Sequence, residues 1–292
     1  MSKGSKKQEA GSKKQETRSR KQETGSRKQE TGSRKQEARS RKQEARSKPK
    51  VAFFDFASCE GCQLTVVDSL QTHVDLLDAV EIVQFREATS DRGEDYAIAF
   101  VEGSVNRQQD EVRLKRIREQ AAVLVALGAC AHTGCVNALR NLQPLDEVRR
   151  YVYGEHADWY DAYEARPLSA VVKVDAFIPG CPIDREEFIE VVKALLVGKK
   201  PPVPDYPVCV ECKLKGNVCM FHIGKNCMGP VTRAGCGAIC PTYGDGCEGC
   251  RGWIPNPNEN AMKDVLAEAG LTVEQIMSRF TMFNAYESKQ QS

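Results

Sequence analysis

The sequence predicts an α/β protein in which a parallel sheet is followed by a smaller cysteine-rich segment. Short apolar runs alternate with longer amphipathic stretches between residues 50 and 200. Strands that alternate with helices form parallel sheets covered on both faces. After residue 208, eight of the 13 cysteines fall within 42 residues. Before both parts, residues 1–49 contain almost no Val, Ile, Leu or aromatic residue.

Residues 1–49 are predicted to be a disordered basic tail. Six near-copies of a seven-residue unit begin at Ser5, the first reading SKKQEAG. The chain's net charge of +2 is the sum of two oppositely charged parts. Residues 1–50 hold 18 basic and 6 acidic side chains, and the remaining residues hold 24 basic and 34 acidic ones. One Ala or Thr per unit is too little for a coiled coil. Charge blocks are usually solvated, so we expect no nucleic-acid partner, although basic arms can bind one.

Five apolar runs, rich in Val, Ile, Phe or Ala, are expected to form the strands of the sheet. They begin at Val51, Val80, Tyr96, Ala122 and Val171. Helical patterns lie between them, over residues 64–77, 110–120, 136–152 in pieces, and 185–197. This alternation predicts a flavodoxin-like domain over residues 50–200, with five parallel strands.

Four cysteines follow the predicted strands directly. Cys59 and Cys62 come after the first strand, Cys130 after the fourth and Cys181 after the fifth. Ligands of such sheets bind at the carboxyl ends of the strands, so these four thiols should converge. Four thiolates suit either a tetrahedral zinc ion or a cubane iron–sulfur cluster. A CxxC pair could also be a thioredoxin-like redox site, but that site needs no cysteines at other strand ends.

A Pro-rich stretch from Lys199, KKPPVPDYP, marks the start of a second domain over residues 201–292, which we expect to end in a C-terminal helix. Its eight cysteines are Cys209, Cys212, Cys219, Cys227, Cys236, Cys240, Cys247 and Cys250. This density, with Pro241 after Cys240 and many glycines, is typical of a small ferredoxin-like unit that holds two four-cysteine clusters. A pair of structural zinc sites is the alternative.

The location that we expect is the cytoplasm. No run of the roughly 18 to 20 apolar residues that a membrane span needs is present, and the N-terminus lacks a signal-peptide core. Reducing compartments disfavour disulfides, so the abundant cysteines indicate metal or cluster ligation.

Seven motifs carry a resemblance to a known family. In chain order they are SCEGCQL, VEGSV, GACAHTGC, PGCPIDREEF, PVCVECKLKGNVC, CMGPVTRAGCGAICP and CEGCRG. Together they resemble the small subunit of cytoplasmic nickel–iron hydrogenases, most closely the delta subunit of NADP-linked sulfhydrogenases of the group 3b type. The likeness runs from about Val51 to about Phe283.

The resemblance implies three [4Fe-4S] clusters and no catalytic residue on this chain. The implied proximal ligands are Cys59, Cys62, Cys130 and Cys181; the medial ligands are Cys236, Cys240, Cys247 and Cys250; the distal ligands are Cys209, Cys212, Cys219 and Cys227. The nickel–iron centre would belong to a large-subunit partner. Electrons from hydrogen would pass on to iron–sulfur and flavin subunits of diaphorase type that reduce NADP.

Two alternatives to this function remain open. Within the family, the chain could serve a deazaflavin-linked or heterodisulfide-reductase-linked hydrogenase, because their small subunits share most of these motifs. From another class, it could be a zinc-stabilised binding module whose basic tail contacts nucleic acid.

Five residues near the motifs need separate interpretation. Cys135 and Ile183 stand where the family usually has Gly and Pro. We expect Cys135 to be a small buried thiol, although it could perturb the proximal site. We assign no ligand role to His132 or His222, and we interpret Glu60 first as a surface or interface carboxylate.

Overall fold

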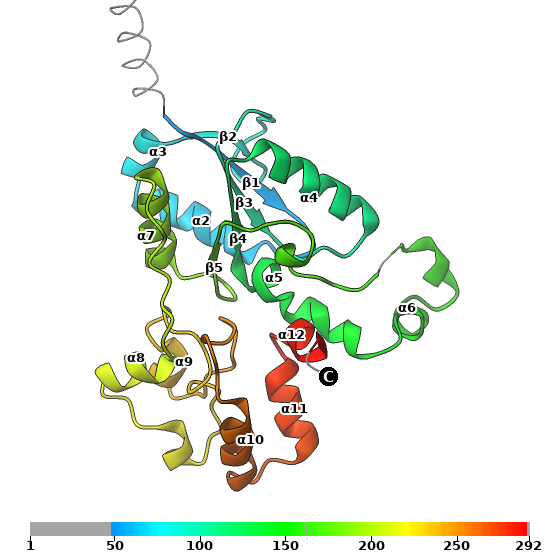
Figure 1. Cartoon of the computed structure of the whole chain (residues 1–292), viewed down its shortest axis with the longest axis vertical. Helices are drawn as coiled ribbons and strands as arrows, with labels where there is room; N and C mark the ends of the chain where they lie inside the picture. The colour runs from blue at the N-terminus through cyan, green and yellow to red at the C-terminus, as the bar shows by residue number, and fades with distance from the viewer. Residues whose placement is uncertain (1–47, 162, 291–292) are drawn as a thin grey trace, which may run out of the picture. The chain divides into compact units, whose positions relative to one another are not determined.

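The computed structural model describes residues 48–161 and 163–290 (Figure 1). The predicted disordered tail lies outside these residues, apart from its last two. The described residues from Pro49 onward form one compact unit. No helix among the described residues is long and apolar enough to cross a membrane.

The predicted sheet is present, with five parallel strands in the order β2-β1-β3-β4-β5. The strands are β1 (Lys50–Asp55), β2 (Glu81–Phe85), β3 (Ile98–Glu102), β4 (Val123–Leu127) and β5 (Ala176–Ile178). This is the flavodoxin-like order, which confirms the predicted fold. All five carboxyl ends therefore lie along one edge of the sheet.

Eleven α-helices are found among the described residues. They are α2 (Gly61–Thr72), α3 (Asp75–Ala79), α4 (Gln108–Gln120), α5 (Gly128–Thr133), α6 (Leu145–Tyr153), α7 (Arg185–Leu196), α8 (Val208–Leu214), α9 (Ile239–Thr242), α10 (Glu259–Glu268), α11 (Val273–Thr281) and α12 (Ala285–Gln290). Short 3-10 helices occupy Cys135–Leu142, Gly154–Trp159, Leu168–Ala170 and Met220–Ile223.

Side chains that alternate along the strands build a core on each face of the sheet. On one face, the stacked rings of Phe53, Phe85 and Phe100 pack against α2, α3 and α7. On the other, small strand residues such as Ala52 and Ala99 pack against α4 and α5 (Figure 1). This alternation follows from the two-residue period of a strand. The loops at the carboxyl edge therefore extend from a sheet that is packed on both faces.

Two expected helices differ from the observed ones. The helix expected over residues 64–77 is instead divided into α2 and α3. The hydroxyl of Ser69 donates to the Thr65 carbonyl at 2.7 Å and that of Thr72 to the Ser69 carbonyl at 3.0 Å. Such bonds compete with the helical ladder and favour its end. The single C-terminal helix that we expected is instead three, and α10 and α11 have their own core, which includes Leu266 and Phe280.

The α4 face of the core should be sensitive to lost volume. Leu114 of α4 is fully buried, so Leu114→Ala should lower the free energy of unfolding by about 2–5 kcal/mol. Chemical unfolding of the full chain measures this change. Val112→Ala, on the exposed side of the same helix, is the control and should change the free energy by less than about 0.5 kcal/mol. Equal effects of the two substitutions would contradict this account of the core.

Candidate functional site

The four strand-end cysteines lie together at the carboxyl edge of the sheet. Cys62 lies in the first turn of α2, Cys130 in α5 directly after β4, and Cys181 in the loop after β5. The Cys62 thiol interacts electrostatically with those of Cys59 and Cys181. Burial, followed by the charge of Glu102, raises the pKa of Cys62. A buried thiol of this kind is ionised only with a metal or another positive charge beside it.

Close backbone packing brings the first and fourth of these loops together. A Cβ atom on Gly128 would stand 2.3 Å from the Cys62 sulfur, and Gly128 has a φ of +82°. Both facts require glycine at this position. The glycine before Cys130 is therefore the residue that lets Cys62 approach α5.

Glu102, at the end of β3, anchors the CxxC turn by hydrogen bonds to its backbone. Its buried carboxylate accepts hydrogen bonds from the backbone N–H groups of Cys62 at 3.2 Å and Gln63 at 3.0 Å. Burial raises the pKa of Glu102, and these two bonds oppose that rise. We assigned Glu102 no role from the sequence. The available signal was a charged residue that ends the otherwise apolar run IAFVE.

Cys135 is fully buried, which confirms the expected buried thiol, and it also adjoins the proximal thiols. Interaction with the Cys130 thiol is the largest effect on the pKa of Cys135, which rises to about 12, and the Cys181 thiol also acts on it. The residue has a φ of +48°, a left-handed conformation that favours glycine. The backbone thus retains the shape expected for the family's usual Gly while the side chain adds a fifth sulfur.

The four predicted medial cysteines line one cavity of about 200 Å³. They are Cys236, Cys240, Cys247 and Cys250. Cys181 lines the same cavity from the sheet side, together with Arg251 and Glu248. A cavity with four thiols in its wall has the lining that a cubane cluster needs.

The four predicted distal cysteines form a neighbouring group. Cys209 and Cys212 lie on α8, Cys219 directly precedes the 3-10 helix Met220–Ile223, and Cys227 is buried in the segment that follows this helix. Burial raises the pKa of Cys209 to about 11, and the other three thiols each add to that rise. All four thiols are therefore close enough to interact.

The three groups follow one another in series. Cys181 of the proximal group lines the cavity of the medial thiols, which connects the first group with the second. The N–H of Cys247 donates to the Cys227 sulfur at 3.1 Å, which connects the medial group with the distal one. A bond of this kind favours the ionised form of the accepting sulfur.

Among residues 48–161 and 163–290, no three His, Cys, Asp or Glu side chains are grouped as a single metal ion would require. Four thiols around a cavity of about 200 Å³ suit a cubane cluster.

The other residues considered from the sequence lie around these groups. His132 stacks on the ring of Phe177 at 4.1 Å, and burial lowers its pKa to about 4. His222 is exposed, and Glu60 is half-buried. Burial, followed by the charge of Glu87, raises the pKa of Glu60.

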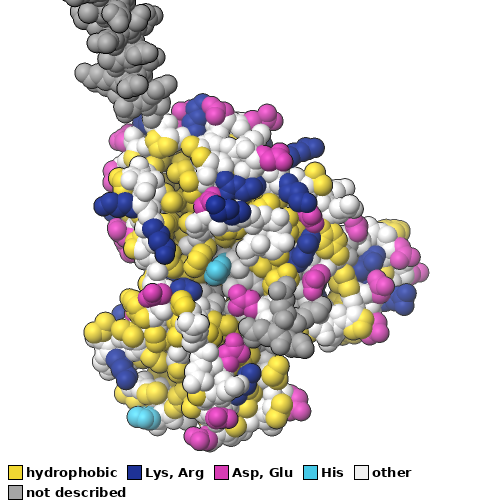
Figure 2. Space-filling model, in the orientation of Figure 1, with side chains coloured by type: hydrophobic (Ala, Val, Ile, Leu, Met, Phe, Trp, Pro, Cys, Tyr) yellow, Lys and Arg dark blue, Asp and Glu magenta, His cyan; other side chains and the backbone are white. Residues whose placement is uncertain are grey.

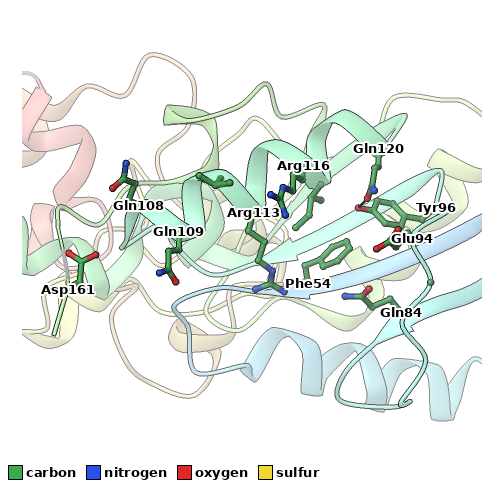
Figure 3. Close-up of a pocket in the computed structure, with 13 residues that line it drawn as sticks. Phe54, Gln84, Glu94, Tyr96, Gln108, Gln109, Arg113, Arg116, Gln120 and Asp161 are labelled. Carbon is green, nitrogen blue, oxygen red and sulfur yellow. Dashed lines mark hydrogen bonds between the residues drawn. The ribbon is translucent and has the colours of Figure 1, made fainter. Parts of the chain in front are cut away.

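A separate hollow of about 510 Å³ lies between α4 and the sheet (Figure 3). Its lining includes Phe54, Gln84 and Arg113, and none of the cysteines. The guanidinium of Arg113 lies 4.8 Å from the Phe56 ring centroid and donates to the Asp55 carbonyl at 2.7 Å. The hollow plays no part in the thiol sites.

Comparison with known proteins agrees with this geometry. Residues 59–195 match the family described as NADH ubiquinone oxidoreductase, 20 Kd subunit. Sulfhydrogenase 2 subunit delta of Pyrococcus furiosus is 38% identical over 236 residues, which cover 80% of this chain and 98% of that protein. The chain belongs to the family of nickel–iron hydrogenase small subunits.

Further relatives of this small subunit have related names. One subunit of the vhu F420-non-reducing hydrogenase of Methanocaldococcus jannaschii is 30% identical over 272 residues, covering 81% of this chain and 94% of that one. A crystal structure of an NAD+-reducing [NiFe]-hydrogenase in the H2-reduced state has a TM-score of 0.49 and 27% identity, over 54% of this chain and 96% of that one. As in its family, the chain is an oxidoreductase subunit whose hydrogen-activating site lies on the large subunit.

Filling the space at Gly128 should disrupt the proximal site. In Gly128→Ala the new methyl group would displace the Cys62 sulfur, so the protein should lose about four irons per chain. Gly154→Ala is the matched control, because Gly154 also has a positive φ, +56°, but a Cβ there meets nothing within 4 Å. Iron and acid-labile sulfide analysis of both variants measures the difference. Equal iron content in the two would contradict the proposed packing.

Proposed function

We propose that this chain is the electron-transfer small subunit of a cytoplasmic nickel–iron hydrogenase. In this proposal, electrons released from hydrogen on the large subunit pass through proximal, medial and distal [4Fe-4S] clusters toward an NADP-reducing flavin module. Bound clusters would supply one-electron redox chemistry. The observation that carries the proposal is the serial placement of three groups of four thiols, in which Cys181 lines the cavity of the medial thiols and the N–H of Cys247 donates to the Cys227 sulfur.

The protein's own part in this function is to hold twelve thiolates and exclude water. Glu102 fixes the CxxC turn, and Glu211 of α8 fixes the loop around Cys236 by accepting from the N–H groups of Gly235 at 2.8 Å and Ala238 at 3.2 Å. Hydrogen bonds to sulfur and burial are the main means by which a protein tunes a cluster's potential. Both are present at the Cys227 sulfur, which is buried and also accepts from the N–H of Gly229 at 3.4 Å.

Exposed apolar residues at the two ends of the series support two partners. At the proximal end, Cys59, Leu64 and Val136 are exposed, which suits docking of the large subunit. At the distal end, Leu214, the last residue of α8, is 82% exposed, and hydrophobic side chains are visible over both halves of the face drawn in Figure 2. Exposed apolar patches mark interaction surfaces. We propose that an iron–sulfur subunit of diaphorase type docks at this distal end.

Metal analysis tests the proposal directly. The anaerobically purified complex should contain about twelve acid-labile sulfides per small subunit, and about twelve irons besides that of the nickel–iron centre. About two zinc ions per chain without sulfide would refute the proposal and favour the zinc-stabilised module.

Substitutions at Cys181 and Cys135, whose side chains are neighbours in space, test the ligand assignment. Cys181→Ser should lose the proximal cluster and stop hydrogen oxidation, because Cys181 is a proposed ligand. Cys135→Ala, at the neighbouring sulfur, should keep all three clusters, because each already has four thiolates. Low-temperature EPR of the reduced complexes counts the clusters. Full activity in Cys181→Ser would refute the proximal assignment.

The acceptor is tested on the purified complex with hydrogen as the donor. The proposal expects reduction of NADP by a co-purifying flavin subunit. The second candidate is a deazaflavin-linked or heterodisulfide-reductase-linked enzyme, and the relatives include subunits named for an F420-non-reducing hydrogenase and for a coenzyme F420 hydrogenase. A complex that reduces a heterodisulfide or a deazaflavin, and not NADP, would establish that alternative.

A further inference from the structure

A buried ion pair lies between the proximal and medial thiols. Arg251 directly follows Cys250, and its side chain is 1% exposed. Its Nη2 atom donates to Oε1 of Glu187 on α7 at 2.6 Å, and the Glu187 side chain is 7% exposed. A charge this deeply buried is retained only where it is paired and hydrogen-bonded. The pair therefore joins the cysteine-rich segment to a helix of the sheet domain.

The same guanidinium also fastens the loops that carry two other thiols. Its Nε donates to the Ala234 carbonyl at 2.8 Å, and its Nη1 donates to the Pro179 carbonyl at 2.8 Å. Ala234 stands two residues before Cys236, and Pro179 stands two residues before Cys181. One side chain thus holds segments from the proximal loop, the medial loop and α7.

The pair lies directly against the backbone of the medial loop. A Cβ atom on Gly235 would stand 2.2 Å from Nη2 of Arg251 and 2.7 Å from Oε1 of Glu187, so only glycine fits before Cys236. Among the described residues that line the medial cavity, Arg251 is the only basic one. The two acidic ones are otherwise engaged: Glu248 pairs with Arg279, and Asp184 caps α7.

A guanidinium keeps its positive charge at every pH at which the protein is folded. Because Arg251 lines the cavity together with Cys236, Cys240, Cys247 and Cys250, its charge is a permanent positive charge beside the proposed medial ligands.

We propose that Arg251 is a positioning residue for electron transfer that raises the reduction potential of the medial cluster, and that Glu187 limits this rise. The inference rests on the proposed function, since it requires a cluster at the medial thiols. Reduction adds one negative charge to a cluster, so a fixed positive charge nearby stabilises the reduced form. The carboxylate of Glu187 has the opposite effect, and Glu187, unlike Arg251, is not among the residues that line the medial cavity.

Redox titration of the purified hydrogenase complex, followed by EPR, tests the proposal. Arg251→Met should lower the midpoint potential of the medial cluster relative to the other two, and Arg251→Lys should largely retain it. Glu187→Gln should raise it, because it removes the negative charge and leaves the arginine. A purely structural role predicts no such opposite shifts.

Arg118→Met is the matched control. Arg118 also pairs with a carboxylate, Asp175, and donates to the Ala121 and Ala122 carbonyls, but at the amino ends of β4 and β5, away from the cysteines. Arg118→Met should leave the midpoint potentials of all three clusters unchanged. Potentials in Arg251→Met and Glu187→Gln equal to those of the control, or shifted in the same direction, would overturn the proposal.

Separate outcomes distinguish this inference from the proposed function. If Arg251→Met fails to retain its medial iron, Glu187→Gln decides alone, and an absent or downward shift there overturns the inference. If the unaltered complex has no cluster at the medial cysteines, the proposed function itself fails. If all three clusters are present and the substitutions do not shift the potential of the medial cluster, only the proposed role of Arg251 is refuted.

Discussion

The ion pair between Arg251 and Glu187 is the contact on which the relative position of the thiol groups depends. It is buried on both sides and fixes the loops before Cys181 and Cys236 at the same time. Removing one member of such a pair typically costs about 3–5 kcal/mol, because the other charge is left buried and unpaired. A whole domain is stable by only about 5–15 kcal/mol. The junction between the sheet and the cysteine-rich segment therefore has few tolerated substitutions at these two positions.

The parallel sheet supplies the other constraint, since it delivers every strand end to one edge. The thiols after β1, β4 and β5 meet at this edge. No contact between their side chains is needed to bring the loops together. Local residues then refine the arrangement: Glu102 anchors the turn at Cys62, and the missing side chain of Gly128 admits the sulfur. A cysteine-rich segment with a small core can then be organised from an edge that is already rigid.

Much of this arrangement could be predicted from sequence because it follows local periodicity. Apolar runs at a steady interval predicted the five strands and their order, and with them the convergence of Cys59, Cys62, Cys130 and Cys181. The break between α2 and α3 was not predictable, because it depends on hydroxyl bonds within the helix. Nor were the partners of Glu102 and Arg251, which lie 40 and 64 residues away. Long-range polar contacts leave no periodic signal, so a single sequence indicates only that a charge occurs in an unusual place.

The order of the thiol groups along the chain differs from their order in space, and the C-terminal helices explain how this is possible. The distal cysteines come first in the chain, but Cys247 and Cys250 return to lie between them and Cys181. Residues later in the chain hold this loop in place. Arg279 of α11 pairs with Glu248, and Asn284 donates to the Gly249 carbonyl at 3.3 Å. The Phe283 carbonyl in turn accepts from the Thr133 hydroxyl of α5 at 2.7 Å, which ties this end of the chain to the sheet domain. The medial group is thus enclosed between the sheet edge and the last helices, so its geometry depends on residues that carry no thiol at all.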